Sequence, residues 1–464
     1  MEPERVGLTH VGDRCSSQAE CGSGFACDPE NGRCQLAYNG FHGVTDGEIK
    51  LGASMFFMGM SAELGQAYKL KIQVYLNHIN DLGGVYGRQI TFVQLDDEDV
   101  PATAVSNVTQ LLSGDNRPVF ALLANTGSAT TEAALPVVNE NRAVLFAPYT
   151  GSQATRLDPP EEYIFNFRAS FLQEAAAVTN YLVGVRDPVL ATANLMVVAQ
   201  GEPGSSQTGI ERLDAFGQQG FSGVADTLKT HGVDRGSVFF TSYDRGTAAV
   251  DTAVEDTIHW LVSPDRVADA SGKFEVGIIL QAVTAAAVPY ITELIDEVNR
   301  VKGGQPSTFG LTMEEEEQLR NVELVLTGTS TVANALPTEL KFRQGGAKEY
   351  CGDIIISQTV PLFSSSAQGV NVYRDHLQTF DANAKAGQTS LEGYLATRVF
   401  VQALEDAGPD LTDDVLVEAL EEMGTLDIGI GTEIHLSAAR HQALDKVWGT
   451  ALNADCEYTE FALE

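Results

Sequence analysis

Basic residues are scarce in this chain of 464 residues, in which 29 lysines and arginines face 63 acidic residues and the formal net charge is −34. A surface of that charge repels phosphate backbones and anionic lipid headgroups, so we do not expect nucleic-acid binding. Long hydrophobic runs are also missing. The longest candidate, Val276 to Val288, is interrupted by Gln281 and Thr284, so we expect no membrane-spanning helix.

Catalytic motifs are missing as well. None of the eight histidines lies in an HExxH pattern, and Ser128 has no G-x-S-x-G surroundings. Gly429-Ile430-Gly431 lacks the third glycine of a dinucleotide loop, and Asp96 to Asp99 lacks the glycine and the final glutamate of an EF-hand loop, so we interpret the acidic run as a solvated turn. The sequence therefore predicts no enzyme activity, no catalytic residue, no metal and no cofactor.

Six cysteines are present, and four of them, Cys15, Cys21, Cys27 and Cys34, crowd into residues 1–46. They are separated by five, five and six residues, with no histidine between them, which does not fit a zinc knuckle. A segment this small cannot build a core, so we predict two disulfides, whose pairing the sequence leaves open among three possibilities. Cys351 and Cys456 would form a third bond if the fold brings them together.

Disulfides indicate an oxidising compartment, so we predict a periplasmic or extracellular protein. Residues Met1 to Gly12 contain no apolar core of a signal peptide. We expect either that a signal segment was removed before this numbering begins or that Met1 is not native. Whether residues 1–46 tether the protein to a membrane stays open.

From Ile49 onward, strand and helix patterns alternate. Apolar runs typical of buried strands lie at 49–54, 90–95, 119–123, 143–147, 194–199, 276–281 and 322–327. Apolar residues at helical spacing lie between them, first over 64–82 and late in the chain over 390–407. This alternation predicts an α/β protein whose parallel sheets carry helices on both faces, and its two runs predict two similar lobes.

The first run contains Ile79-Asn80 followed by Gly83-Gly84-Val85, then Gly87-Arg88, Asp96-Asp97 and Pro101-Ala102. With these pieces the chain resembles the type I periplasmic binding proteins, and more narrowly the branched-chain amino acid (Leu/Ile/Val) binding proteins of ABC transporters. The segment 390–420 also matches that family, and the resemblance covers about 47–460.

The resemblance implies two doubly wound parallel-sheet lobes joined by a three-segment hinge. The crossings would lie near Phe167-Arg168, Gln358 to Pro361 and Gly429 to Gly431. The first lobe would then comprise 47–167 with 362–428, and the second 168–361 with 429–464, while 1–46 would form a separate Cys-rich segment and linker. Lobes built from discontinuous segments suit hinge closure.

Ligands of open α/β sheets bind beyond the carboxyl ends of the strands, which selects the loops that follow the predicted strands. The resemblance implies that these same loops line the cleft between the lobes. The candidate ligand-binding residues are Phe56, Phe57, Met58, Asn125, Thr126, Ser128, Tyr149, Thr150, Ser152, Gln200, Glu202, Gln281 and Thr329.

By resemblance, hydroxyl groups in two of these loops would hold a ligand carboxylate. Ser128 and Thr126 match the first position. At the second, Gly151 stands where the family carries a threonine, so Thr150 or Ser152 is the substitute.

An ammonium group on the ligand would need an acidic partner in the second lobe. The loop Gln281 to Thr284 has none, and Glu202 is the remaining candidate. Phe56, Phe57 and Met58 are apolar where the family often carries Ser, Gly and Pro, which favours a more apolar ligand such as a lipid, a sterol or an aromatic acid. The alternative is that these three side chains only pack under their loop.

The predicted function is that of an extracytoplasmic solute-binding protein that captures a small molecule by hinge closure. Its partner would be the permease of an ABC transporter or another inner-membrane transporter. Two alternatives stay open, namely an amino acid binding protein and a ligand-sensing receptor domain that works with a separate signalling partner.

Overall fold

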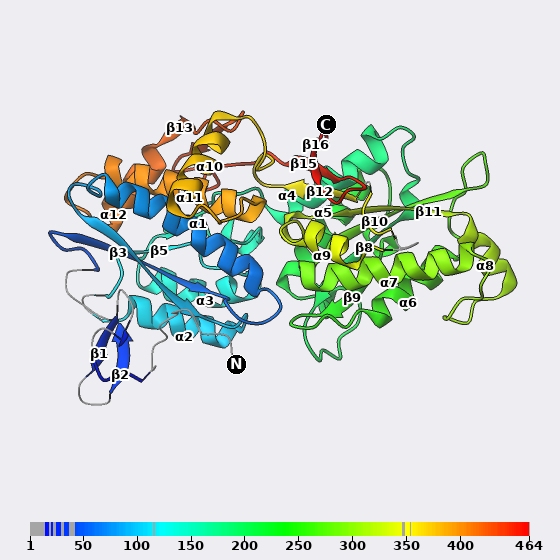
Figure 1. The fold of residues 1–464 in the computed structure, drawn as a ribbon, viewed down its shortest axis with the longest axis horizontal. Helices are drawn as coiled ribbons and strands as arrows, with labels where there is room; N and C mark the ends of the chain where they lie inside the picture. Colours follow the sequence, from blue (N-terminus) through cyan, green and yellow to red (C-terminus); the bar gives the residue numbers. More distant parts are fainter. Residues whose placement is uncertain are drawn as a thin grey trace. The chain divides into compact units, whose positions relative to one another are not determined.

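The computed structural model describes residues 14–17, 20–21, 25–28, 32–36, 42–114, 117–345, 349–352 and 354–463 (Figure 1). The interpretation of Met1 to Gly12 falls outside these residues. The chain divides into two compact units. Unit 1 comprises residues up to Arg168 with 366–386 and 390–444, and unit 2 comprises 169–365 with 387–389 and 445–464.

Unit 1 is built on a five-stranded, all-parallel sheet in the order β4-β3-β5-β6-β7. Its strands are β3 (Glu48–Met55), β4 (Gln89–Asp96), β5 (Ala121–Leu123), β6 (Leu145–Phe146) and β7 (Ile164–Phe165). Its helices and its antiparallel hairpin are α1 (Ala62–Asp81), α2 (Pro101–Leu112), α3 (Ser128–Glu140), α10 (Gln368–Phe380), α11 (Gln388–Asp406), α12 (Asp413–Glu422), β13 (Gly424–Asp427) and β14 (Glu433–Leu436). Helices α1, α10 and α11 cover one face of the sheet, and α2 and α3 cover the other (Figure 1).

Unit 2 is built on a seven-stranded sheet in the order β16-β15-β12-β11-β10-β8-β9. Its strands are β8 (Leu195–Gly201), β9 (Phe239–Asp244), β10 (Phe274–Gln281), β11 (Val322–Gly328), β12 (Ile354–Gln358), β15 (Trp448–Leu452) and β16 (Tyr458–Phe461). Its helices are α4 (Phe171–Asn180), α5 (Ala215–Thr230), α6 (Asp251–Leu261), α7 (Thr284–Lys302), α8 (Met313–Arg320) and α9 (Leu336–Arg343). One core lies between the sheet and α4 with α5, and another between the sheet and α6 with α7.

The predicted doubly wound α/β architecture is confirmed, with one exception in the strand directions. β15 and β16 run antiparallel to their neighbours at one edge of the unit 2 sheet, whereas the prediction was of parallel strands throughout. The run 143–147 is buried throughout, but only Leu145 and Phe146 form β6. The apolar run in the sequence therefore correctly indicates buried residues here, but it predicts a longer strand than the two residues that form β6.

The chain passes for the last time from unit 1 to unit 2 at Leu444–Asp445, whereas the third crossing was expected near Gly429 to Gly431. Those glycines lie within unit 1, because the carbonyl of Gly429 accepts a hydrogen bond of 2.7 Å from the backbone N–H of Gly369. The segment then continues beside β7, where the backbone N–H of Leu444 donates to the carbonyl of Phe167 at 3.0 Å.

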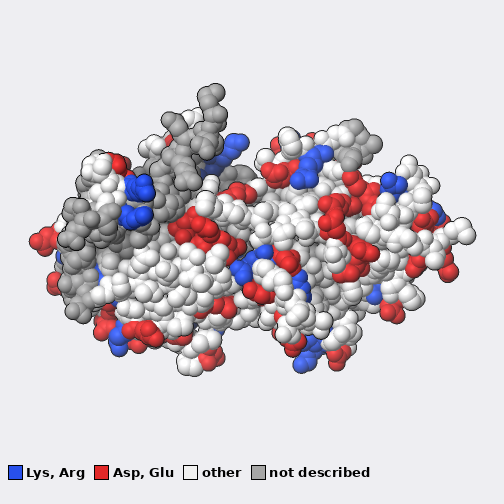
Figure 2. Space-filling view, turned by 90° about the horizontal axis from the view of Figure 1, so that it is seen from below, with Lys and Arg blue, Asp and Glu red and all other residues white. Residues whose placement is uncertain are grey.

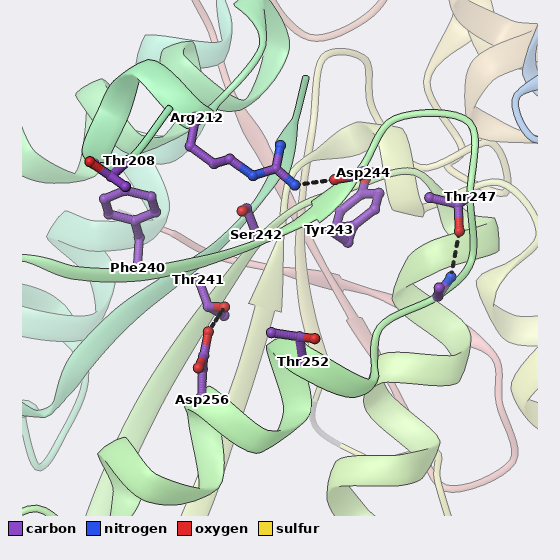
Figure 3. Close-up of a pocket in the computed structure, with 12 residues that line it drawn as sticks. Thr208, Arg212, Phe240, Thr241, Ser242, Tyr243, Asp244, Thr247, Thr252 and Asp256 are labelled. Carbon is purple, nitrogen blue, oxygen red and sulfur yellow. Dashed lines mark hydrogen bonds and ion pairs between the residues drawn. The ribbon is translucent and has the colours of Figure 1, made fainter. Parts of the chain in front are cut away.

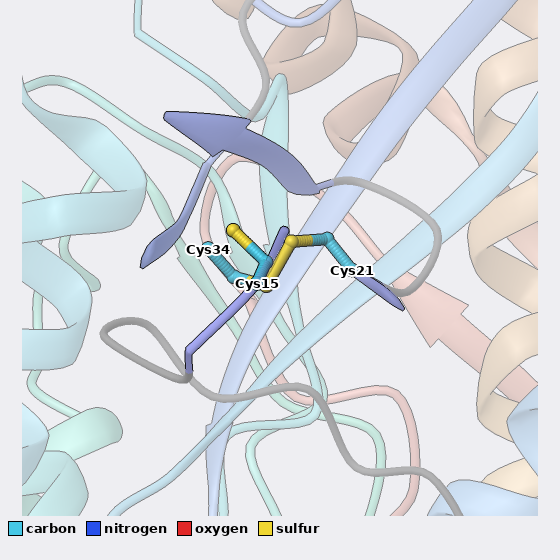
Figure 4. Close-up of side chains that lie close together, drawn as sticks. All are labelled: Cys15, Cys21 and Cys34. Atoms are coloured by element: carbon cyan, nitrogen blue, oxygen red, sulfur yellow. A yellow bond between two sulfur atoms is a disulfide. The ribbon is translucent and has the colours of Figure 1, made fainter. Parts of the chain in front are cut away.

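The cysteines pair as Cys15–Cys27 and Cys21–Cys34, and Cys27 and Cys34 belong to the two strands of a small hairpin, β1 (Phe25–Asp28) and β2 (Arg33–Leu36). The predicted two-disulfide segment is confirmed, and its open pairing is settled. Among the residues that the structure describes, one group of three side chains lies close enough together to hold a metal ion. It consists of Cys15, Cys21 and Cys34 (Figure 4). Their sulfur atoms are engaged in disulfides, so they offer no thiolate to a metal ion.

The third disulfide joins Cys351 to Cys456 across 105 residues in unit 2. We predict that the double substitution Cys351→Ser with Cys456→Ser lowers the unfolding free energy of unit 2 by about 2–5 kcal/mol, because a long closed loop no longer restrains the unfolded chain. Differential scanning calorimetry should show one transition at a lower temperature, while the transition of unit 1 serves as the internal control. Equal transition temperatures in the oxidised wild type and the variant would contradict this prediction.

Candidate functional site

The carboxyl ends of the unit 1 strands carry the first group of predicted residues. Phe56 and Phe57 are buried, and their backbone N–H groups donate to Thr126 Oγ1 at 2.9 Å and to Asp96 Oδ1 at 3.0 Å. Met58, by contrast, is 51% exposed. The apolar trio is therefore divided: the two aromatic rings pack beneath the loop, as the alternative interpretation held, and the methionine presents its side chain at the surface.

The Phe57 ring also lies next to a cation. The Lys69 ammonium sits 4.9 Å from the centroid of this ring, and burial lowers the pKa of Lys69 to about 8. A helical side chain leans toward the N-terminus of its helix, and this carries the head of Lys69 back toward the loop that precedes α1. The edge thus combines apolar surface with one partly dehydrated positive charge.

Two hydroxyl groups that the sequence placed in separate loops meet in the structure. Ser128 Oγ and Thr150 Oγ1 lie 2.8 Å apart, and both residues are buried. Ser128 is the first residue of α3, behind Gly127, whose φ of +88° is a backbone conformation that L side chains rarely adopt. The pair therefore stands at a helix N-terminus, a place that favours negatively charged groups.

The remaining predicted polar residues of unit 1 hold the loops in place. Asn125 Oδ1 accepts from the backbone N–H of Ser54 at 3.2 Å. Ser152 Oγ donates to Glu132 and accepts from the backbone N–H of Ala154 at 3.1 Å.

Tyr149 likewise packs inside unit 1. Its ring lies 4.7 Å from that of Tyr68, and the Arg168 guanidinium lies 5.0 Å from the centroid of the Tyr149 ring. Of the polar side chains predicted in this unit, Ser128 and Thr150 best fit an anionic group of a ligand.

Beneath the unit 1 loops lies a carboxyl group that the sequence interpretation treated as solvated. That interpretation is wrong for Asp97, which is fully buried. Its Oδ2 accepts from Ser54 Oγ at 2.8 Å and its Oδ1 from the backbone N–H of Asp99 at 3.0 Å. Burial raises the pKa of Asp97 to about 7. An acidic run in the sequence shows only that charge is present, and burial of its second member becomes visible only in the fold.

In unit 2, the predicted residue Gln200 belongs to a buried hydrogen-bond chain. Its Nε2 donates to Asp214 Oδ2 at 2.8 Å, and its Oε1 accepts from the Tyr243 hydroxyl at 3.2 Å. Asp214 caps α5 by accepting from the backbone N–H of Gly217 at 2.9 Å, and burial raises its pKa. Sequence reasoning missed Asp214, although an aspartate directly before a helix is a capping signal.

Glu202, the predicted partner of a ligand ammonium, lies at the surface with its side chain 50% exposed. Its Oε1 is 3.1 Å from Arg245 Nη2, and Arg245 Nε lies 3.4 Å from Asp214 Oδ2. The carboxylate of Glu202 is thus already engaged by a guanidinium.

The side chain of Gln281 turns into the layer under α5. It packs against Gly220, where an added Cβ would come within 2.3 Å of it, and its Nε2 donates to the Phe216 carbonyl at 3.2 Å. Thr329, also buried, lies with its Oγ1 3.2 Å from Thr331 Oγ1. Both of these candidate ligand-binding residues are therefore buried within unit 2.

Charged groups of opposite sign adjoin one another on the protein surface. On the face drawn in Figure 2, acidic side chains form several groups, and several Lys and Arg side chains lie directly beside them. With 63 acidic and 29 basic residues, the carboxylates outnumber the cations by more than two to one. Lys and Arg side chains on this surface therefore tend to have acidic side chains nearby.

Comparison with known proteins identifies the architecture. The model of the periplasmic binding protein family matches residues 48–256. This chain has the fold of a type I periplasmic binding protein. The fold implied by the resemblance stated from the sequence is thereby confirmed. No curated protein matches the sequence.

Solved structures of this fold cover nearly the whole chain. A possible leucine/isoleucine/valine-binding protein from Rhodopirellula baltica has a TM-score of 0.71 at 23% identity over 90% of this chain and 97% of its own. A fatty acid ABC transporter substrate-binding protein from Thermomonospora curvata has a TM-score of 0.67 at 18% identity, covering 92% and 96%. A solute-binding protein of R. palustris in complex with benzoate has a TM-score of 0.66 at 13% identity, covering 89% and 95%.

Asp97 makes the stability of unit 1 depend on pH. Its folded pKa of about 7 lies above the unfolded value near 3.8, so the folded state keeps a proton that the unfolded state has lost. Its contribution is fully present below pH 4 and is lost as the pH rises through 7, at no more than about 1.4 kcal/mol per pH unit. We predict that Asp97→Asn removes this slope between pH 4 and 7, as measured by urea unfolding.

Glu98→Gln, which removes an exposed carboxylate from the same turn, controls for the change in net charge. Because other groups also titrate in this range, the quantity to compare is the difference between wild type and variant at each pH. A difference that stays constant from pH 4 to 8 would show that Asp97 does not bind the proton.

Proposed function

We propose that this protein is an extracytoplasmic solute-binding protein that captures a small apolar molecule between the strand-end loops of its two units. Closure about the segments that join the units would trap the ligand, and the permease of an ABC transporter or another inner-membrane transporter would recognise the closed form. Ligand contacts made only in the closed form drive this change, and about 5.5 kcal/mol of differential affinity moves closure from 1% to 99%.

The proposal of an apolar ligand rests on one observation: the carboxylates along the strand ends of unit 2 already have hydrogen-bond or ion-pair partners within the protein. Glu174 accepts hydrogen bonds from the backbone N–H and the hydroxyl of Ser330 at 2.8 and 3.0 Å, and from Ser357 Oγ at 2.8 Å. Asp214 and Glu202 lie beside Arg245, and Asp244 pairs with Arg212. An ammonium group would compete with these partners, whereas an apolar body would leave them intact.

The unit 1 edge supports the same ligand class. Met58 offers exposed apolar surface. In the hydroxyl pair of Ser128 and Thr150, one O–H makes the bond between the two side chains, which leaves the other O–H to donate to an anionic group. A lipid or aromatic acid with one carboxylate fits both features. A fatty acid ABC transporter substrate-binding protein and a solute-binding protein in complex with benzoate have the same fold, which supports this ligand class.

Binding should therefore depend on Met58. We predict that Met58→Ser weakens the binding of octanoate by about tenfold to a hundredfold, since burying a methionine contributes roughly 1.5–3 kcal/mol. Isothermal titration calorimetry with octanoate, benzoate and leucine as probes would measure this. Met313→Ser, at a methionine that is 88% exposed on α8, is the matched control and should leave the affinity unchanged.

Native mass spectrometry of protein purified from its own host would test the ligand class independently. A recovered lipid or aromatic acid would support the proposal. If an amino acid is recovered, and if leucine binds more tightly than octanoate, the alternative of an amino acid binding protein replaces it.

A further inference from the structure

A groove of about 560 Å³ runs along β9, the strand at one edge of the unit 2 sheet (Figure 3). Five consecutive residues, Phe240 to Asp244, line it. Because successive side chains of a strand point to opposite faces, a lining of consecutive residues means that the groove passes over the free edge of the strand. One wall is the loop that contains Thr208 and Arg212, and the other is α6.

The walls of the groove are rich in hydroxyl groups. Those of Thr208, Ser242 and Thr252 have no hydrogen-bond partner among the described residues, and Figure 3 places them on both sides of the strand. β9 pairs with β8 alone, so half of its backbone N–H and C=O groups face away from the sheet. A ligand that meets these groups must both donate and accept hydrogen bonds, as hydroxyl groups do.

The charged side chains of the groove are already paired with other groups in it. Arg212 and Asp244 form an ion pair at one end, and Asp256 Oδ2 accepts from Thr241 Oγ1 at 2.7 Å at the other (Figure 3). A charged ligand would have to compete with these contacts, so the groove favours a neutral one.

An aromatic ring lies among the hydroxyl groups. Phe240 is half-buried, and its ring meets that of Phe221 edge-on with the centroids 5.0 Å apart. Sugars combine an apolar C–H face, which stacks on aromatic rings, with hydroxyl groups around their rim. The Phe240 ring beside the hydroxyl groups of Thr208, Ser242 and Thr252 matches that pattern.

We propose that this groove is a binding site for a neutral polyhydroxylated molecule of mono- or disaccharide size. The site lies wholly within unit 2. The groove shares the Arg212–Asp244 ion pair with the strand ends of unit 2, and its other lining includes residues of β9 and α6.

Saturation-transfer NMR with D-glucose, myo-inositol and sucrose as probes tests this site on the whole protein. We expect at least one probe to bind with a Kd on the order of 1 mM, as is usual for about a dozen ligand atoms. Phe240→Ala should weaken that binding by about tenfold or more, and Ser242→Val should do the same with less effect on folding. Circular dichroism and thermal unfolding would confirm that both variants are folded.

Phe380→Ala, at a partly exposed phenylalanine of unit 1, is the matched control and should bind like the wild type. Absence of saturation transfer from every probe up to about 50 mM would overturn the proposal. So would an affinity that Ser242→Val leaves unchanged. An affinity that falls with Ser128→Ala but not with Ser242→Val would assign the sugar to the unit 1 loops, and the groove would then not be its site.

Discussion

The common direction of the strands is the constraint on which the other features of this protein depend. All five strands of the β4-β3-β5-β6-β7 sheet in unit 1 and the five strands β8 to β12 of unit 2 run parallel, so each sheet gathers the carboxyl ends of these strands at one edge. Each loop there must satisfy its own backbone groups, because a buried N–H or C=O without a partner is costly. Many polar side chains at these edges therefore form hydrogen bonds with the backbone of the loops. Only the polar groups without such bonds are available to a ligand.

Close approach of helix to loop follows from the same constraint. In unit 1, a Cβ added to Gly65 on α1 would lie 1.9 Å from the carbonyl oxygen of Phe56, and in unit 2 a Cβ added to Gly217 on α5 would lie 2.0 Å from that of Gln200. Both glycines thus allow the helix to pack closely against the carboxyl end of an inner strand, β3 or β8. The two units thus share the same close contact between a helix and the end of the preceding strand, although the surrounding side chains differ.

The sequence predicted the long elements well and the roles of individual side chains poorly. β3 and β4 were found within one or two residues because eight-residue apolar patterns bounded by turns are unambiguous. The edge strand β9 was missed, since the polar side chains of Thr241, Ser242 and Asp244 obscure its pattern. Hydroxyl and amide groups were predicted at the strand ends, where Thr126 accepts from the backbone N–H of Phe56 in the loop and Asn125 from that of Ser54 in β3. Residue type cannot distinguish a side chain that holds a loop from one that holds a ligand, because both need the same hydrogen-bonding groups.

The charged side chains at the strand ends also bind mainly to other groups of the protein. The chain has fewer than half as many cations as carboxylates, yet Arg245 and Arg212 both stand beside carboxylates at the strand ends of unit 2. Two buried carboxylates are stabilised by hydrogen bonds or by protonation: Glu174 accepts from three donors, and the raised pKa of Asp97 favours its neutral form. In each case the carboxyl group is stabilised within the protein, so it does not need a cationic group of a ligand as its partner. For the apolar acid proposed as the ligand, such an edge would discriminate by shape and apolar contact more than by charge, even in a protein of this acidity.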